Sequence, residues 1–204
     1  MMVRSCARYI FMLLLVSSFV FAACGPEEPG QPKTAGVSQF LGDDFGFKYP
    51  DNARLDIRRE NEWAQRTIEV TGPEVRIDGS SYAGYAFTLE FFGNTPAESA
   101  REFAETRILA AYEAAEDAGE PSGMWPVDPE TGEIEGRRVR VHGLEAWEVR
   151  FFAGDAEQVR TFVIGPETGA AVALTYRDTP PENNPLAPLH YSMYTMALET
   201  LRVK

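Results

Sequence analysis

The chain has 204 residues, of which 31 are Asp or Glu and 19 are Lys or Arg, so its formal net charge is −12 at pH 7. This charge argues against nucleic-acid binding, which needs a net basic face, and against electrostatic docking on anionic lipid. The length predicts a single domain. The hydrophobic share of 44% is typical of a globular chain and excludes a disordered one.

The first 23 residues have the three parts of an export signal. Arg4 and Arg8 form a short positive region, residues 9–23 carry no charge, and Ala22 and Ala23 are small residues just before Cys24. The uncharged run is too short to favour a membrane span, which needs about 20 apolar residues.

Residues 21–24, Phe-Ala-Ala-Cys, resemble the lipobox of bacterial lipoproteins. The resemblance implies that residues 1–23 are removed as a signal peptide and that a diacylglyceryl group is attached to the thiol of Cys24. The membrane partner of the protein is then the lipid bilayer of the bacterial cell envelope, with inner and outer membrane both open. An ordinary cleaved signal and an uncleaved anchor helix are the alternatives.

Removal of this signal changes both the thiol content and the charge. Cys6 lies within it and Cys24 carries the lipid, so the mature domain has no thiol for a disulfide, a metal or a nucleophile. Removing Arg4 and Arg8 leaves 17 basic residues, and the mature net charge is 17 − 31 = −14.

Residues 24–39 are rich in Pro and Gly and have almost no large apolar side chains, so we predict a flexible tether there. A single globular domain is predicted over residues 40–204. Its first strands are expected at residues 45–49, 53–59 and 66–71. The strongest strand is expected at residues 82–92, where apolar side chains alternate.

A helix is predicted after this strand. Thr95 is the expected N-cap, Pro96 suits the first helical position, and Glu98 completes a capping box. Four further strands (residues 137–142, 145–153, 157–164 and 169–177) and a last helix at about 188–201 follow. This order predicts an α+β fold in which a central and a C-terminal helix pack on an antiparallel sheet.

Over residues 40–204 this layout resembles the PsbP-like group. The resemblance rests on Phe-Gly-Phe-Lys-Tyr-Pro at residues 45–50, on the central helix that follows a long strand, and on the hairpin Gly-Leu-Glu-Ala-Trp-Glu-Val at residues 143–149. It implies an α/β/α sandwich around an antiparallel sheet. It also implies a non-enzymatic role in binding or assembly.

The domain has no pattern of residues typical of an enzyme. His142 and His190 are far apart and lack the clustered ligands of a zinc site. Residues 128–133 lack the ligand series of a calcium-binding EF-hand and are expected to form a solvated turn. Ser80 and Ser81 do not lie in a nucleophile elbow and are expected in a hairpin turn. We therefore predict no catalytic residues, no metal and no cofactor.

The candidate partner-binding residues are Met124, Trp125, Arg138 and Arg140. Met124 and Trp125 lie in a polar, Pro-rich loop, where an exposed Trp would be a recognition anchor; packing over the edge of the core is the alternative. Arg138 and Arg140 point the same way on a strand and could receive a partner's carboxylate, or form weak surface ion pairs.

These patterns predict a lipid-anchored interaction module of the cell envelope that binds a protein partner through the loop at residues 120–136 and the adjacent face of the sheet. The first alternative is a small-ligand binder with a pocket between sheet and helix. An envelope hydrolase is the second alternative, and clustered His or carboxylate groups in one cleft would support it.

Overall fold

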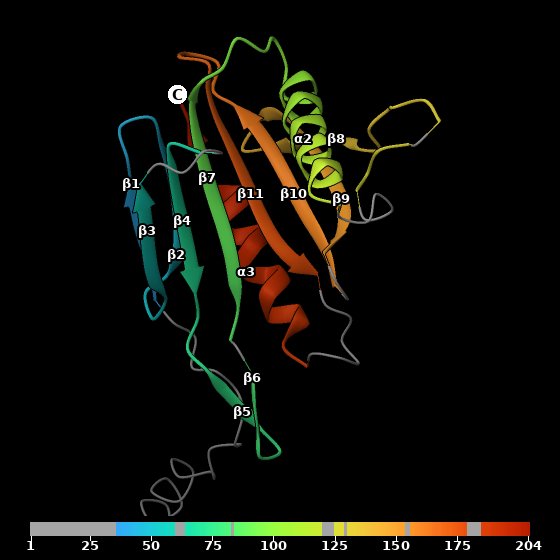
Figure 1. The fold of residues 1–204 in the computed structure, drawn as a ribbon. Coiled ribbons are helices and arrows are strands. Elements are labelled where there is room, and N and C mark those ends of the chain that lie inside the picture. The colour runs from blue at the N-terminus through green and yellow to red at the C-terminus, as the bar shows by residue number, and fades with distance from the viewer. Residues whose placement is uncertain are drawn as a thin grey trace, which may run out of the picture. The chain divides into compact units, whose positions relative to one another are not determined.

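A computed structural model describes residues 36–59, 64–82, 84–119, 125–128, 130–153, 156–178 and 185–204 (Figure 1). The predicted signal peptide, Cys24 and most of the predicted tether lie outside these ranges. Residues 34–204 form one compact unit. Strand β1 (Val37–Leu41) is part of it, so the predicted boundary at residue 40 was wrong by at least three residues.

Within the described ranges, seven strands form one antiparallel sheet, the main sheet, in the order β3-β4-β7-β11-β10-β9-β8. Helix α2 (Ala100–Asp117) lies in front of this sheet and helix α3 (Ala187–Thr200) lies behind it (Figure 1). The predicted α+β class is therefore confirmed. The strands of the main sheet are β3 (Arg54–Arg59), β4 (Arg66–Thr71), β7 (Ala86–Asn94), β8 (Arg137–Val141), β9 (Leu144–Ala153), β10 (Ala156–Ile164) and β11 (Ala170–Asp178).

The strand predicted at residues 82–92 is divided in the structure, so its predicted start was wrong. Residues 84 and 85 belong to no strand. Only a glycine fits at position 84, because a Cβ there would lie 2.0 Å from the carbonyl oxygen of Pro73. Only β7 continues into the main sheet. The predicted alternation holds within β7, whose buried side chains on one face are Phe87, Leu89 and Phe91.

The residues before this break form a hairpin outside the main sheet. Strands β5 (Val75–Ile77) and β6 (Ser80–Tyr82) pair antiparallel. Asp78 and Gly79 turn the chain between them with φ angles of 50° and 81°. Positive φ at both central residues is typical of a tight hairpin turn. The hairpin was predicted correctly, but Ser80 and Ser81 belong to its second strand.

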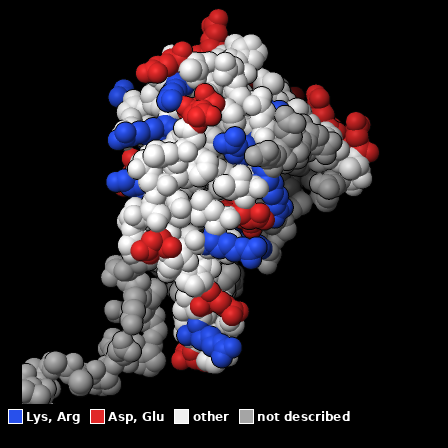
Figure 2. Space-filling model, turned by 90° about the vertical axis from the view of Figure 1, so that its left-hand side faces the viewer, with Lys and Arg blue, Asp and Glu red and all other residues white. Residues whose placement is uncertain are grey.

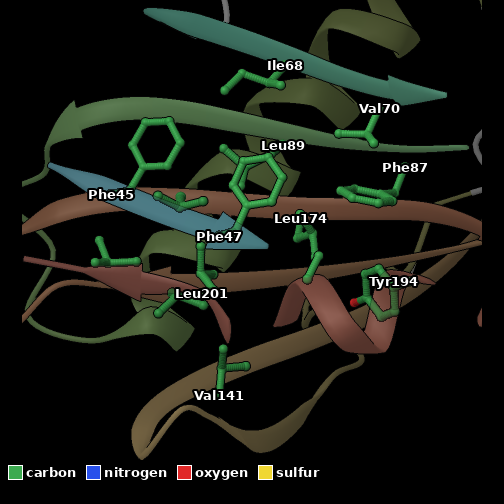
Figure 3. Packing of buried hydrophobic residues seen from close by; sticks show 14 of the residues in the cluster. Phe45, Phe47, Ile68, Val70, Phe87, Leu89, Val141, Leu174, Tyr194 and Leu201 are labelled. Atoms are coloured by element: carbon green, nitrogen blue, oxygen red, sulfur yellow. The ribbon is translucent and has the colours of Figure 1, made fainter. Parts of the chain in front are cut away.

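Behind the main sheet, α3 lies in the same layer as a second sheet, the small sheet. In the described part of the chain it has the order β1-β2-β12, with β2 at Phe45–Pro50 and β12 at Arg202–Val203. Aromatic residues of β2 pack onto the main sheet. Phe45 stacks on Phe91, and Phe47 meets Phe87 edge to face (Figure 3). Each fully buried Phe contributes about 1.5–3 kcal/mol to folding.

Helix α2 covers the opposite face over β9 and β10. Phe103 meets Phe162 of β10 edge to face, at 5.9 Å between ring centroids, and Ile108 is also buried there. The main sheet therefore has a hydrophobic cluster on each face, one under α3 and the small sheet and one under α2.

The predicted start of α2 was wrong by one turn. Ser99 is the N-cap, since its Oγ accepts a hydrogen bond from the backbone N–H of Glu102 at 3.1 Å. Thr95 instead donates its backbone N–H to the carbonyl oxygen of Gly169 at 2.9 Å. This contact lies at the end of the pairing between β7 and β11, and it keeps Thr95 outside the helix.

Candidate functional site

A cavity of about 230 Å³ lies between α3 and strands β8 to β11 on the rear face of the main sheet. The antiparallel register determines which side chains reach it. Arg137 of β8 lies opposite Glu148 of β9, and Arg150 follows on the same face of β9 two residues later. Tyrosines from β11 and α3 complete its wall: Tyr176, Tyr191 and Tyr194.

Glu148 is the centre of the polar half of this cavity. It is only 8% exposed, and its Oε1 lies 2.6 Å from Nη2 and 2.8 Å from Nε of Arg137. Nε of Arg150 approaches the same oxygen at 3.5 Å. A buried carboxylate is stable only when paired, so the two arginines explain why a glutamate is tolerated there.

The ion pairs continue beyond this group of three. Nη1 of Arg150 lies 3.1 Å from Oε2 of Glu157 on β10. A second hollow of about 290 Å³ shares Arg137, Glu148 and Arg150 with the first and extends to Glu135 and Gly136. Because each charge here has an opposite charge beside it, the polar half is close to neutral.

The tyrosines form the aromatic half. The rings of Tyr176 and Tyr194 lie 4.3 Å apart between centroids, and Tyr191 lies 6.2 Å from Tyr176. The hydroxyl of buried Tyr194 is 2.6 Å from Oγ1 of Thr161 on β10. Burial raises the pKa of Tyr194 well above its usual range, so the phenol stays protonated. Tyr191, which is 56% exposed, stands at the entrance.

His142 borders this cavity in the turn between β8 and β9. Its Nδ1 lies 3.2 Å from the backbone carbonyl oxygen of Glu199 in α3. It is therefore a locally hydrogen-bonded ring, as the sequence predicted. Across the described part of the chain, no group of three or more His, Cys, Asp or Glu side chains has the arrangement of a metal site.

The predicted partner-binding residues lie mostly elsewhere. Met124 is outside the described residues. Trp125 is half buried and stacks on Phe151 at 5.8 Å with an angle of 3° between the rings, in the cluster under α2. Arg138 is exposed and lies 3.6 Å from Glu145. Arg140 is exposed and borders the cavity. Their role in binding a partner stays a prediction.

Asp128 and residues 130–133 form a turn. Oδ1 of Asp128 accepts hydrogen bonds from the backbone N–H groups of Thr131 at 3.0 Å and Glu130 at 2.8 Å. These two bonds hold the pKa of Asp128 below its usual range. This carboxylate oxygen therefore accepts its hydrogen bonds from within the turn.

Sequence reasoning missed Glu148, Arg150 and Tyr176 as site residues. In the strand predicted at residues 145–153, Glu148 and Arg150 alternate with Trp147, Val149 and Phe151. Alternation of this kind usually places the charged residues on the face that meets water. The sequence signal that could have indicated a covered face was the last helix, predicted at about residues 188–201 to pack on the sheet.

No helix among the described residues is both long and apolar enough to cross a bilayer.

No family model and no curated protein matches this sequence. Among solved structures, the chain is similar to a protein from Bacteroides thetaiotaomicron VPI-5482, with 9% sequence identity and a TM-score of 0.40. The alignment covers 84% of this chain, and the chain spans about half of the other one, 49% of its length.

Proposed function

We propose that this chain is an exported, lipid-anchored binding protein of the cell envelope, without catalytic activity, that takes a small ligand between α3 and the main sheet. The observation that carries the proposal is the cavity with one aromatic and one charged half. Ligand sites are typically concave, with apolar walls and a few placed polar groups. Tyr191 at its entrance offers a ring face, and Arg137, whose side chain is 65% exposed, offers hydrogen-bond donors.

The chemistry of the cavity favours binding over catalysis. The carboxylate of Glu148 is held in ion pairs with Arg137 and Arg150, and the raised pKa of Tyr194 keeps its hydroxyl protonated. Polar groups that are held in place in this way can orient a ligand.

The anchor and the family remain part of the proposal. We propose that Cys24 carries the lipid and that the domain has the PsbP-like sandwich, for which the helices on opposite faces of one antiparallel sheet give support. A protein partner that contacts Met124, Trp125, Arg138 and Arg140 is a second candidate. The exposure of the Arg138 side chain, 72%, favours it.

The ligand site is tested with phenylacetate, a probe that has one ring and one carboxylate. Saturation-transfer NMR on the membrane-extracted protein is expected to detect binding to the wild type. Thr195→Trp fills the cavity from α3 and is expected to abolish the signal, whereas Ser192→Trp, an equally large change on the exposed side of α3, keeps it. Equal signals from both variants contradict the proposed site.

The anchor is tested separately by intact mass. The membrane-extracted protein is expected to lack residues 1–23 and to carry a diacylglyceryl-sized addition, and Cys24→Ala is expected to lose that addition. An unmodified Cys24 contradicts the anchor and leaves the ligand site unaffected.

A further inference from the structure

The outward face of the small sheet combines apolar and basic side chains. Val37 and Leu41 of β1 are 59% and 75% exposed. Alternation places both on the side of β1 opposite Phe40, which stacks inward on Phe45 and Phe47.

The pairing of the strands in the small sheet places two basic side chains on the same outward face. Lys48 of β2 pairs with Gln39 between the two exposed apolar residues of β1, and Arg202 of β12 pairs with Gly46, which itself lies opposite Leu41. Lys48 and Arg202 are both exposed. No strand residue on this outward face is acidic, and the nearby carboxylates Asp43, Asp44 and Asp51 lie in the flanking turns.

The outward face of the small sheet therefore carries positive charge, although the whole chain has a net charge of −12. Figure 2 shows the side of the molecule that carries β1 and β3. Uncharged side chains make up much of its centre, Lys and Arg lie along its left-hand margin and also right of the centre, and Asp and Glu lie above and below. Exposed apolar groups flanked by basic ones are typical of surfaces that lie on a bilayer with anionic headgroups.

The covalent chain brings this surface close to the proposed anchor. Cys24 and Gly36 are separated by residues 25–35, and Val37 follows at once. Even a fully extended spacer of this length reaches only about 40 Å at roughly 3.3–3.6 Å per residue. Among the described elements, β1 is therefore the one that follows the proposed anchor most closely along the chain.

We infer that the outward face of the small sheet, formed by Val37, Gln39, Leu41, Lys48 and Arg202, docks on the surface of the bilayer that holds the lipid of Cys24. This inference rests on the anchor in the proposed function. The apolar side chains enter the headgroup region, and the basic ones contact anionic headgroups. Docking in this orientation holds the domain against the bilayer, which the acyl chains alone do not do.

The test measures the depth of single labels. Once Cys6 is removed and Cys24 is alkylated, the mature domain has no free thiol. Leu41→Cys therefore gives one site for an environment-sensitive NBD dye. Phe152→Cys on β9 is the matched control, since Phe152 is 56% exposed and lies on the half of the main sheet far from β3. Both proteins are reconstituted, with lipid, in phosphatidylcholine vesicles with and without phosphatidylglycerol.

The label at position 41 is expected to show blue-shifted emission and several-fold stronger quenching by nitroxide lipid than the label at position 152. Phosphatidylglycerol is expected to strengthen both signals, by roughly fivefold in partitioning for each basic residue near the surface. Lys48→Gln combined with Arg202→Gln is expected to remove that strengthening.

Two outcomes overturn the inference in distinguishable ways. If intact mass shows the lipid on Cys24 but the label at position 41 is as accessible to water as the label at position 152, the docking surface is wrong and the anchor stands. If intact mass shows no lipid, the anchor is wrong and the docking inference falls with it.

Discussion

The hydroxyl groups of Tyr194 and Thr161 lie 2.6 Å apart, and this contact joins α3 to the middle of the main sheet. Both residues are buried, at 2% and 0% exposure, so each hydroxyl depends on the other. The pair positions the aromatic half of the cavity, because the ring of Tyr194 packs on that of Tyr176.

Removing one member of this pair is expected to cost more stability than removing both. Tyr194→Phe leaves the Thr161 hydroxyl buried without a partner, at a cost of about 1–3 kcal/mol in the free energy of unfolding. Adding Thr161→Val is expected to recover part of that loss, since no buried polar group is then left unpaired. Urea unfolding of the wild type, both single variants and the double variant measures the coupling. Purely additive losses would contradict it.

Substitution of Glu148 is expected to destabilise the domain much more than substitution of an exposed ion-pair residue. Glu148→Ala removes the hydrogen bond that Arg137 donates and the ion pair with Arg150, at an expected cost of about 1.5–3 kcal/mol in the free energy of unfolding. Arg138→Ala is the control. Its exposed contact with Glu145 is expected to contribute at most about 1 kcal/mol. The denaturant midpoints of the two variants are compared. Equal losses of stability would show that the buried carboxylate of Glu148 contributes no more than an exposed ion pair.

Stability is expected to fall at high pH because of Tyr85. Burial, together with the nearby charge of Asp51, raises the pKa of Tyr85 from 10.0 to about 12. A phenol with a raised pKa in the folded state stabilises that state fully below pH 10.0, and this stabilisation is lost as the pH rises to about 12. Burial of Tyr194 acts in the same direction.

The measurement is the free energy of unfolding as a function of pH through this window. Tyr85→Phe cannot ionise, so its stability is expected to fall less steeply than that of the wild type. It also loses the hydrogen bond from the Tyr85 hydroxyl to Asn52 Oδ1, so the slopes are compared and not the absolute stabilities. Identical slopes would exclude Tyr85 as a source of the pH dependence.

The N-terminal cap of α2 is tested by two substitutions four residues apart. Ser99→Ala removes the side-chain acceptor for the Glu102 N–H and is expected to cost about 1 kcal/mol. Thr95→Ala is expected to cost less, because the hydrogen bond that Thr95 donates to Gly169 comes from its backbone. Its side chain accepts only the longer hydrogen bond from the backbone N–H of Ala97, at 3.3 Å, before the helix begins. Thermal unfolding measures the stability of both variants. A larger loss for Thr95→Ala than for Ser99→Ala would indicate that Thr95 is the N-cap.

The first residue of α2 could not be predicted from the local sequence alone. Two capping signatures stand in this segment: Thr95 with Glu98, and Ser99 with Glu102. Both are locally plausible. The choice depended on Gly169, far away in sequence, which pairs with Thr95 and extends the sheet instead of allowing the helix to begin.

The strands were more predictable than the site. Alternation in β9 and β10 is a local property, and it placed the limits of these strands within one residue. The same alternation does not predict that α3 covers the rear face of the main sheet. Glu148 and Arg150 therefore looked like residues of a solvated face, although Glu148 is buried and the two form part of the cavity.

The sequence by itself determined the α+β class, the limits of most strands and the residues that share a face, because these depend on periodicities of two and 3.6 residues within one segment. It also carries the lipobox-like pattern at Cys24, which is read along the chain without reference to the fold. The tertiary structure decided which faces are covered, how Tyr176 and Tyr194 meet, and that β1, β2 and β12 form one sheet. These are contacts between segments far apart in sequence, and no local pattern specifies which distant segment will supply the partner.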